Sequence, residues 1–246
     1  MSVSYTTKLC LAFKSGNKCA FENCRKSLTM EGKESNPAVL GEAAHIYGEH
    51  DRAARYRKGM TDEERNHCDN LIYLCPTCHT KIDKQEEDYP ADFLLKLKKK
   101  HEAWILEQLD EGMSEFSFAE LEIAVKAIAS GKHYSNSGFQ AIPPEEKIQK
   151  NRLTDVSRSQ IKMGLSRSAE VRKFLVEMSR LDNHYPERLK DGFKQKYLEL
   201  KKTMSGDLLF IGMLEHAQRG QYEFKLQAAS LAILSYLFLI CEVFEK

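Results

Sequence analysis

The sequence predicts an α+β protein, in which a small domain of short strands and helices is followed by an all-α helical bundle. Three observations support this fold class. Six of the seven cysteines and four of the eight histidines lie before residue 80. Two strand-like runs, 39–47 and 71–75, fall in the same part of the chain. From Pro90 onward, apolar residues recur at helical spacing.

The elements of the first part are expected to be short. Glycines and Pro37 interrupt the stretch 16–59, and a helical turn is expected after Pro76. The next segment begins with Pro90, ends with Gly112 and carries one apolar stripe at helical spacing: Leu94, Leu97, His101, Trp104, Ile105 and Leu109. We therefore expect a helix that ends at Gly112.

A further helix is expected after Ser117, because Ser117 and Glu120 have the spacing of a capping box. Gly131 is placed to cap its C-terminal end. The polar segment 132–143, closed by two prolines, is interpreted as the main hinge or linker.

The rest of the chain is expected to be helical, near 155–165, 167–181, 186–203, 207–218 and 223–244. The last helix is apolar on nearly all faces, which places it at the centre of a bundle. Its apolar run, 228–241, is shorter than the roughly 20 residues of a membrane span, so no membrane association is expected. The expected domains are 1–112, a capped helix and linker at 113–146, and 147–246.

Composition limits the functions to consider. The hydrophobic fraction of 42% and the charged fraction of 30% are typical of a folded globular protein. The net charge is +1, so any nucleic-acid site must come from local clustering. Seven cysteines in a chain that opens without a secretory signal favour a reducing, cytoplasmic location, where metal binding is commoner than disulfides.

Two close cysteine pairs predict a structural metal site. Cys19 and Cys24 enclose four residues, and Cys75 and Cys78 enclose two. Four thiolates in two short knuckles suit tetrahedral Zn²⁺. The alternative is four buried free cysteines, but both pairs lie in polar, turn-rich surroundings. The other three cysteines (Cys10, Cys68 and Cys241) have no partner spacing and are interpreted as structural or incidental.

Between these pairs lies a set of residues suited to phosphodiester chemistry. His79 and Asp83 are four residues apart on the expected short helix, so they share one face and can hold a hard divalent cation. His45, at the end of the first strand-like run, can activate water. Asn70 begins the second run and can orient the histidine backbone or touch the metal. A packed histidine is the alternative for His45 alone.

The order His45, Asn70 and His79, interleaved with the two cysteine pairs, resembles the HNH endonucleases of the ββα-metal fold over about residues 17–102. It is most similar to a branch found in bacterial defence nucleases, through seven pieces: 41–46, 54–56, 60–66, 69–75, 79–83, 89–90 and 101–102. The resemblance implies His45 as general base, Asn70 as the loop-orienting residue and His79 as ligand of a catalytic Mg²⁺ or Mn²⁺. Asp83 occupies the position of a further ligand in many HNH enzymes.

One position departs from the family pattern. Many HNH enzymes carry an acidic residue or histidine just before the base, as another metal ligand, and here that residue is Ala44. Glu42, two residues upstream, is a weak candidate for the missing ligand, and a surface carboxylate is its alternative. Asn70 or the substrate phosphate are the other candidates.

Basic residues cluster just after the first strand-like run. They could form a phosphate-binding loop or simply an ordinary solvated loop. They are Arg52, Arg55, Arg57 and Lys58. Such a loop can hold DNA phosphates beside the scissile bond. Nothing in the sequence indicates reading of specific bases.

The segment 147–246 resembles the C-terminal domain of effectors in bacterial ABC three-component conflict systems. That resemblance implies attachment to a middle component that works with an ABC-type ATPase. The expected function is therefore a DNA-cleaving effector of anti-phage or anti-plasmid defence. A stand-alone restriction-type nuclease and a catalytically dead zinc module that binds DNA or protein are the alternatives. Homo-oligomerisation and RNA cleavage stay open.

Overall fold

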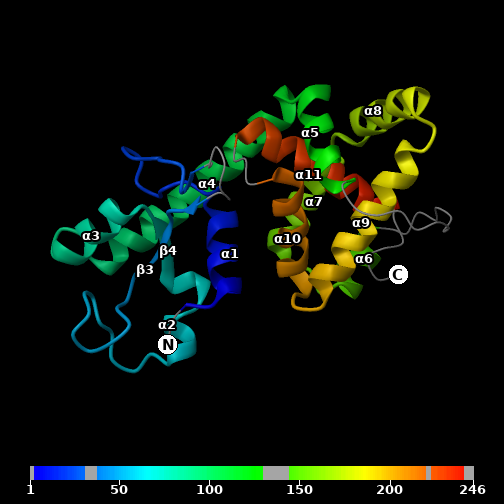
Figure 1. The fold of residues 1–246 in the computed structure, drawn as a ribbon. Coiled ribbons are helices and arrows are strands. Elements are labelled where there is room, and N and C mark those ends of the chain that lie inside the picture. Colours follow the sequence, from blue (N-terminus) through cyan, green and yellow to red (C-terminus); the bar gives the residue numbers. More distant parts are fainter. Residues whose placement is uncertain (1–2, 31–37, 130–143, 220–222, 241–246) are drawn as a thin grey trace. The chain divides into compact units, whose positions relative to one another are not determined.

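In a computed structural model of the protein, residues 3–30, 38–129, 144–219 and 223–240 are described. The chain divides into two compact units, residues 1–107 and 108–246 (Figure 1). The first unit contains the strands and the paired cysteines, whereas helices are the only regular elements among the described residues of the second. The division falls inside a long helix, slightly before the boundary expected at residue 112.

The first unit begins with α1 (Tyr5–Lys14), a helix that the sequence analysis did not predict. The side chain of Ser4 caps it by accepting a hydrogen bond from the backbone N–H of Thr7. Leu9 and Leu11 are its buried residues, and the helix packs against β4 (Leu71–Leu74) and the 3₁₀ turn η1 (Cys68–Asn70). Two buried leucines in a polar segment are too weak a pattern to identify a helix.

The strand-like run 39–47 is broken into two strands. β2 (Ala38–Val39) pairs with β1 (Thr29–Met30), and β3 (Glu42–His45) pairs with β4. Gly41 lies between β2 and β3, and a Cβ atom there would be 2.1 Å from the ring of Tyr73. Glycine is therefore required where the chain passes over Tyr73, and the strand is interrupted at that point.

β3, β4 and the following helix form the framework of the site. The strands are antiparallel, with Glu42 opposite Leu74 and His45 opposite Leu71. All four residues of β4 are buried. The helix α3 (Pro76–Lys84) starts with Pro76 in its first turn, as expected, and packs against both strands. Two strands and a helix in this order agree with the expected ββα arrangement.

The long helix α4 (Ala91–Glu115) continues through Gly112, so the expectation that it ends there is wrong. A Cβ atom at residue 112 would lie 2.8 Å from the carbonyl oxygen of Phe224. Gly112 therefore serves close helix packing within the second unit and does not stop the helix.

The second unit is a helical bundle. The capping box of Ser117 and Glu120 is present at the start of α5, and α5 packs against α9, α10 and α11 as part of the bundle. The capping role of Gly131 and the linker at 132–143 lie outside the described residues. The helices are α5 (Phe118–Ile128), α6 (Pro144–Lys150), α7 (Asp155–Leu165), α8 (Ser168–Leu181), α9 (Tyr185–Lys201), α10 (Gly206–Gln218) and α11 (Phe224–Ile240).

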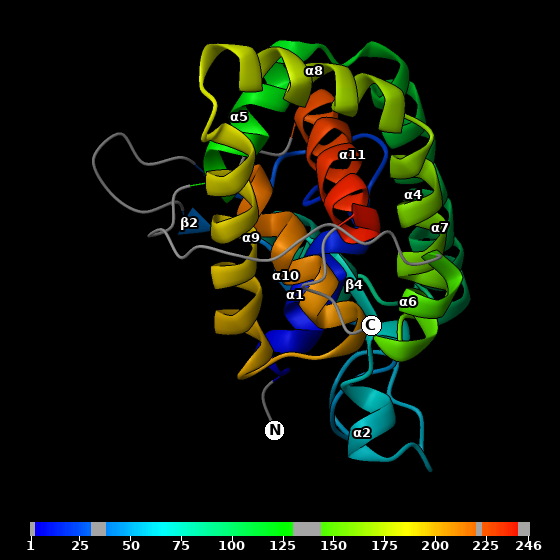
Figure 2. The same cartoon turned by 90° about the vertical axis from the view of Figure 1, so that its right-hand side faces the viewer.

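As predicted, α11 is the central helix of this bundle. It packs against α5, α7, α8 and α10 (Figure 2). Nearly every residue from Leu226 to Phe238 is buried. At Gly164 of α7, a Cβ atom would lie 2.6 Å from the carbonyl oxygen of Leu231, so glycine permits the tight contact between α7 and α11. Among the described residues, no helix has the length and apolarity needed to span a bilayer.

Candidate functional site

The four paired cysteines meet at one point, as the sequence predicted. The sulfur atoms of Cys19, Cys24, Cys75 and Cys78 all lie within 4.8 Å of one another. Those of Cys24 and Cys75 are 3.8 Å apart. A tetrahedral zinc ion with bonds of about 2.3 Å to sulfur separates its sulfur ligands by about 3.8 Å. The geometry of the cluster therefore fits a tetrahedral metal ion.

Burial raises the pKa of two of these thiols. Burial raises the pKa of the Cys19 thiol to about 11. Burial and the neighbouring Cys19 also raise the pKa of Cys78 above its ordinary value. Thiolates in this environment need a compensating positive charge, which a divalent metal ion supplies by displacing the thiol protons.

His45 is half-buried at the end of β3. Its Nε2 lies 3.4 Å from Oδ1 of Asn66. The amide nitrogen of Asn66 donates to the carbonyl oxygen of Asp62, which turns Oδ1 towards the histidine. If the neutral ring donates Nε2–H to this oxygen, Nδ1 carries the lone pair. Asn66 was not among the predicted site residues, because an asparagine in a charged turn has no distinctive spacing.

Asn70 holds the loop that follows His45. Its Oδ1 accepts a hydrogen bond from the backbone N–H of Tyr47 at 2.9 Å. Its Nδ2 donates to the carbonyl oxygens of Tyr47 and Arg65. The side chain is buried and its polar atoms are bonded to the backbone. This arrangement matches a loop-orienting residue, and these bonds leave little capacity to bind a metal ion.

His79 lies between two carboxylates. Its Nδ1 is 2.7 Å from Oε2 of Glu42, and its Nε2 is 3.2 Å from Oδ2 of Asp83. The three side chains are partly exposed, with 28% of His79, 46% of Glu42 and 44% of Asp83 accessible to solvent. The hydrogen bonds to Asp83 and Glu42 raise the pKa of His79, although burial opposes this shift. Without a metal ion, the two acids therefore favour the protonated form of His79.

Arg55 has a different role from the phosphate contact expected from the sequence. Its Nε donates to the carbonyl oxygen of Ile46 and its Nη1 to that of Ile82. Its Nη2 donates to the carbonyl oxygen of His45 at 3.2 Å and to Oδ1 of Asp83 at 2.7 Å. Only 5% of the side chain is exposed. Arg55 thus ties the end of β3 to α3 and is not available to DNA phosphates.

Arg65 is a second internal arginine that the sequence analysis missed. It ends α2 (Asp62–Arg65), which is capped by Thr61 and Glu64. Its guanidinium donates to the carbonyl oxygens of Gly48 and Arg57, so it closes the loop between β3 and α2. Nothing in a run of charged residues marks one member as buried.

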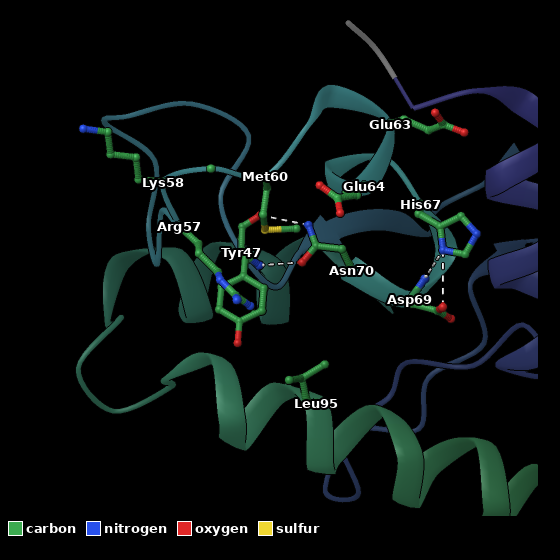
Figure 3. Close-up of a pocket in the computed structure, with 11 residues that line it drawn as sticks. Tyr47, Arg57, Lys58, Met60, Glu63, Glu64, His67, Asp69, Asn70 and Leu95 are labelled. Atoms are coloured by element: carbon green, nitrogen blue, oxygen red, sulfur yellow. Dashed lines mark hydrogen bonds and ion pairs between the residues drawn. The ribbon is translucent and has the colours of Figure 1, made fainter.

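A hollow of about 560 Å³ lies beside Asn70 in the first unit. Figure 3 shows Tyr47 and Arg57 on one side of it, with Leu95 of α4 below them. The guanidinium of Arg57 lies over the ring of Tyr47 at 5.4 Å. Lys58 also lines the hollow, and Arg52, Arg57 and Lys58 are all exposed. These three cations stay available for contact with phosphate.

Residues 19–86 match a family, HNH_2, whose description is HNH endonuclease. The matched segment includes both cysteine pairs, β3, β4 and α3. It also contains the four residues on which the sequence analysis based its chemistry (His45, Asn70, His79 and Asp83). A comparison with curated proteins gave no match.

Proposed function

We propose that this enzyme, whose residues 19–86 match the HNH endonuclease family, cleaves DNA with the help of a divalent metal ion. We propose further that it acts in the bacterial cytoplasm as the nuclease effector of a defence system. One observation carries the catalytic proposal: His45 on β3 and the pair His79–Asp83 on α3 are joined by the buried guanidinium of Arg55.

In this proposal His45 is the general base. Its Nε2–H faces Asn66, so Nδ1 receives the proton of the water that attacks the phosphorus. Asn70 holds the backbone at Tyr47 and thereby the end of β3. The direction of the imidazole thus depends on two asparagines, Asn66 and Asn70.

His79 and Asp83 are the proposed ligands of the catalytic ion. Their facing atoms are 3.2 Å apart, close to the roughly 3.0 Å between neighbouring ligands of an octahedral ion with bonds of about 2.1 Å. The carboxylate oxygen of this pair suits Mg²⁺ or Mn²⁺. Such an ion would stabilise the negative charge that develops on the phosphate and the leaving oxygen.

The four cysteines are the proposed ligands of a structural Zn²⁺. The support is the tetrahedral sulfur spacing and the position of both pairs within the core cluster of the first unit. Cys75 also serves as the N-cap of α3, the helix that carries His79 and Asp83. A metal bound there would therefore fix the start of the catalytic helix.

The proposed phosphate contacts are Arg52, Arg57 and Lys58. Lys58→Ala is expected to weaken the salt dependence of DNA binding. The slope of a plot of log affinity against log salt concentration should fall by about 1. The free energy of unfolding should change by no more than about 0.5 kcal/mol.

Arg55→Ala is expected to lower the free energy of unfolding by roughly 1–3 kcal/mol, because buried carbonyl oxygens lose their donor. Urea denaturation and salt-dependent DNA binding separate the two effects. An Arg55→Ala protein that is as stable as wild type but binds DNA more weakly would show that Arg55 contacts DNA phosphates.

Asp83→Asn is expected to raise the half-saturating Mg²⁺ concentration for nicking by more than roughly 100-fold. A loss of about 100-fold is the largest that is usual for a residue that only supports a metal ligand. Asparagine can still accept the hydrogen bond from Arg55, so the fold should be retained. Excess Mn²⁺ should partly restore activity, and Asp83→Ala should be restored less. Asp92→Asn, an exposed acid on α4, is the control. Equal half-saturating Mg²⁺ for Asp83→Asn and wild type would exclude Asp83 from the site.

The helical unit is the proposed attachment to a middle component that works with an ABC-type ATPase. The support is the resemblance of residues 147–246 and the exposure of three separate apolar side chains on α8 and α9. Leu181 is 82% exposed, Leu198 51% and Val176 45%. Isolation from the native host tests this role: two stoichiometric partners support it, whereas full activity of the isolated chain favours a stand-alone restriction-type nuclease.

A plasmid-nicking assay with Mg²⁺ or Mn²⁺ tests the function as a whole. Metal-dependent nicking that requires His45 supports it. A folded, zinc-loaded protein that cleaves neither DNA nor RNA would favour the alternative of a catalytically dead zinc module.

A further inference from the structure

We propose that Glu42 is a positioning residue and not the missing metal ligand. Glu42 accepts the hydrogen bond from Nδ1–H of His79, so that Nε2 of His79 faces the catalytic ion. This inference depends on the proposed role of His79 and Asp83. It concerns a residue for which the sequence offers only two roles, a weak metal ligand or an exposed carboxylate.

The distances on the two sides of the ring distinguish the two carboxylates. Nδ1 of His79 and Oε2 of Glu42 are 2.7 Å apart, which is the length of a direct, charge-assisted hydrogen bond. Nε2 and Oδ2 of Asp83 are 3.2 Å apart, close to the roughly 3.0 Å between adjacent ligands of an octahedral ion. The spacing on the Asp83 side therefore admits an ion bound by both Nε2 and Oδ2, whereas the Glu42 side has the length of a direct hydrogen bond.

The chemistry of imidazole leads to the same assignment. A neutral ring has one N–H and one lone pair, so the nitrogen that binds a metal leaves the other as a donor. Metal-bound histidines almost always give that second N–H to a carboxylate, a backbone carbonyl or water, which fixes the tautomer and the ring orientation. Glu42 is the only described residue with a hydrogen bond to Nδ1 of His79.

The position of each carboxylate also fits its role. Asp83 is held at Oδ1 by Arg55, which leaves Oδ2 directed towards His79. Glu42 lies on β3, opposite Leu74, and reaches α3 from the neighbouring strand. The contact between Glu42 and His79 thus fixes a ring on α3 to the strand that carries His45, and it sets the side of the ring on which the ion binds.

Titration of the full-length, zinc-loaded protein with Mn²⁺ in the absence of DNA is the main test. Asp83→Asn should weaken Mn²⁺ binding by more than roughly 100-fold, and Glu42→Ala by about 10–100-fold. Glu42→Gln should lose less than about tenfold, because the amide oxygen still accepts from Nδ1–H. A loss in Glu42→Gln as large as that in Asp83→Asn would make Glu42 a ligand and overturn the inference.

¹⁵N NMR of the metal-free protein, at a pH above the pKa of His79, gives a second measurement because it shows which ring nitrogen carries the proton. A purely structural role of Glu42 would not change that tautomer. Wild type and Glu42→Gln should show His79 protonated at Nδ1, whereas Glu42→Ala should show a mixture of tautomers. A ring protonated at Nε2 in wild type would overturn the inference even if Asp83→Asn loses Mn²⁺. Unchanged Mn²⁺ binding in Asp83→Asn, together with the Nδ1 tautomer in wild type, would instead reject the proposed ion site.

Discussion

Replacing His45 by alanine is expected to lower the rate of DNA cleavage by roughly 10²–10⁴-fold, the usual contribution of a general base. Zinc content and DNA binding should stay close to wild type, because His45 is neither one of the four cysteine ligands nor one of the exposed cations of the loop. A plasmid-nicking time course with saturating Mg²⁺ measures the loss of activity. Zinc analysis and a DNA-binding titration of the same preparation show that the loss is catalytic.

His184→Ala is the matched control, because His184 is an exposed histidine of the helical unit that pairs only with local residues. It should cleave at the wild-type rate. Retention of activity within tenfold of wild type by the His45→Ala enzyme would show that another group takes the proton from water. The orientation of Nδ1 by Asn66 would then have no catalytic meaning.

Cys75→Ser is expected to remove zinc and to unfold the first unit, while the helical unit keeps its structure. The free energy of zinc binding to structural sites is roughly 10–16 kcal/mol. This is as large as the whole stability of a domain, about 5–15 kcal/mol. The loss is therefore expected to exceed what the remaining core of the first unit can offset. Metal analysis and hydrogen exchange, which reports the two units separately, measure the outcome.

Cys10→Ser is the matched control, because Cys10 belongs to the same unit but lies outside the four-cysteine cluster. It should keep one zinc ion per chain and a folded first unit. A folded wild-type protein with less than half a zinc ion per chain would contradict the zinc site. The four cysteines would then be buried free thiols.

Much of the candidate site could be predicted because its chemical groups are close together in the sequence. Cys75 and Cys78 lie on one short knuckle, and His79 and Asp83 lie one turn apart on a helix, so local geometry alone brings each pair together. Most helices of the second unit also follow from local signals, such as apolar spacing and the capping box at Ser117. These features need no knowledge of distant contacts.

The tertiary structure alone decided which charged side chains turn inwards. Glu42 and His79 are 37 residues apart, and Arg55 and Asp83 are 28 residues apart. No periodic pattern relates residues at such separations. Arg55 looks like its neighbours Arg52 and Arg57 in the sequence, but the loop places it against four backbone and side-chain oxygens.

The same difference explains the errors at Gly112 and at the run 39–47. By itself the sequence determined where glycines and apolar residues stand, but not whether a glycine ends an element or permits a close approach. Gly112 faces the carbonyl oxygen of Phe224, and Gly41 faces the ring of Tyr73. The sequence therefore determined the chemical groups of the nuclease and their local spacing. Folding decided their partners, because burial and pairing depend on segments that are far apart in the chain.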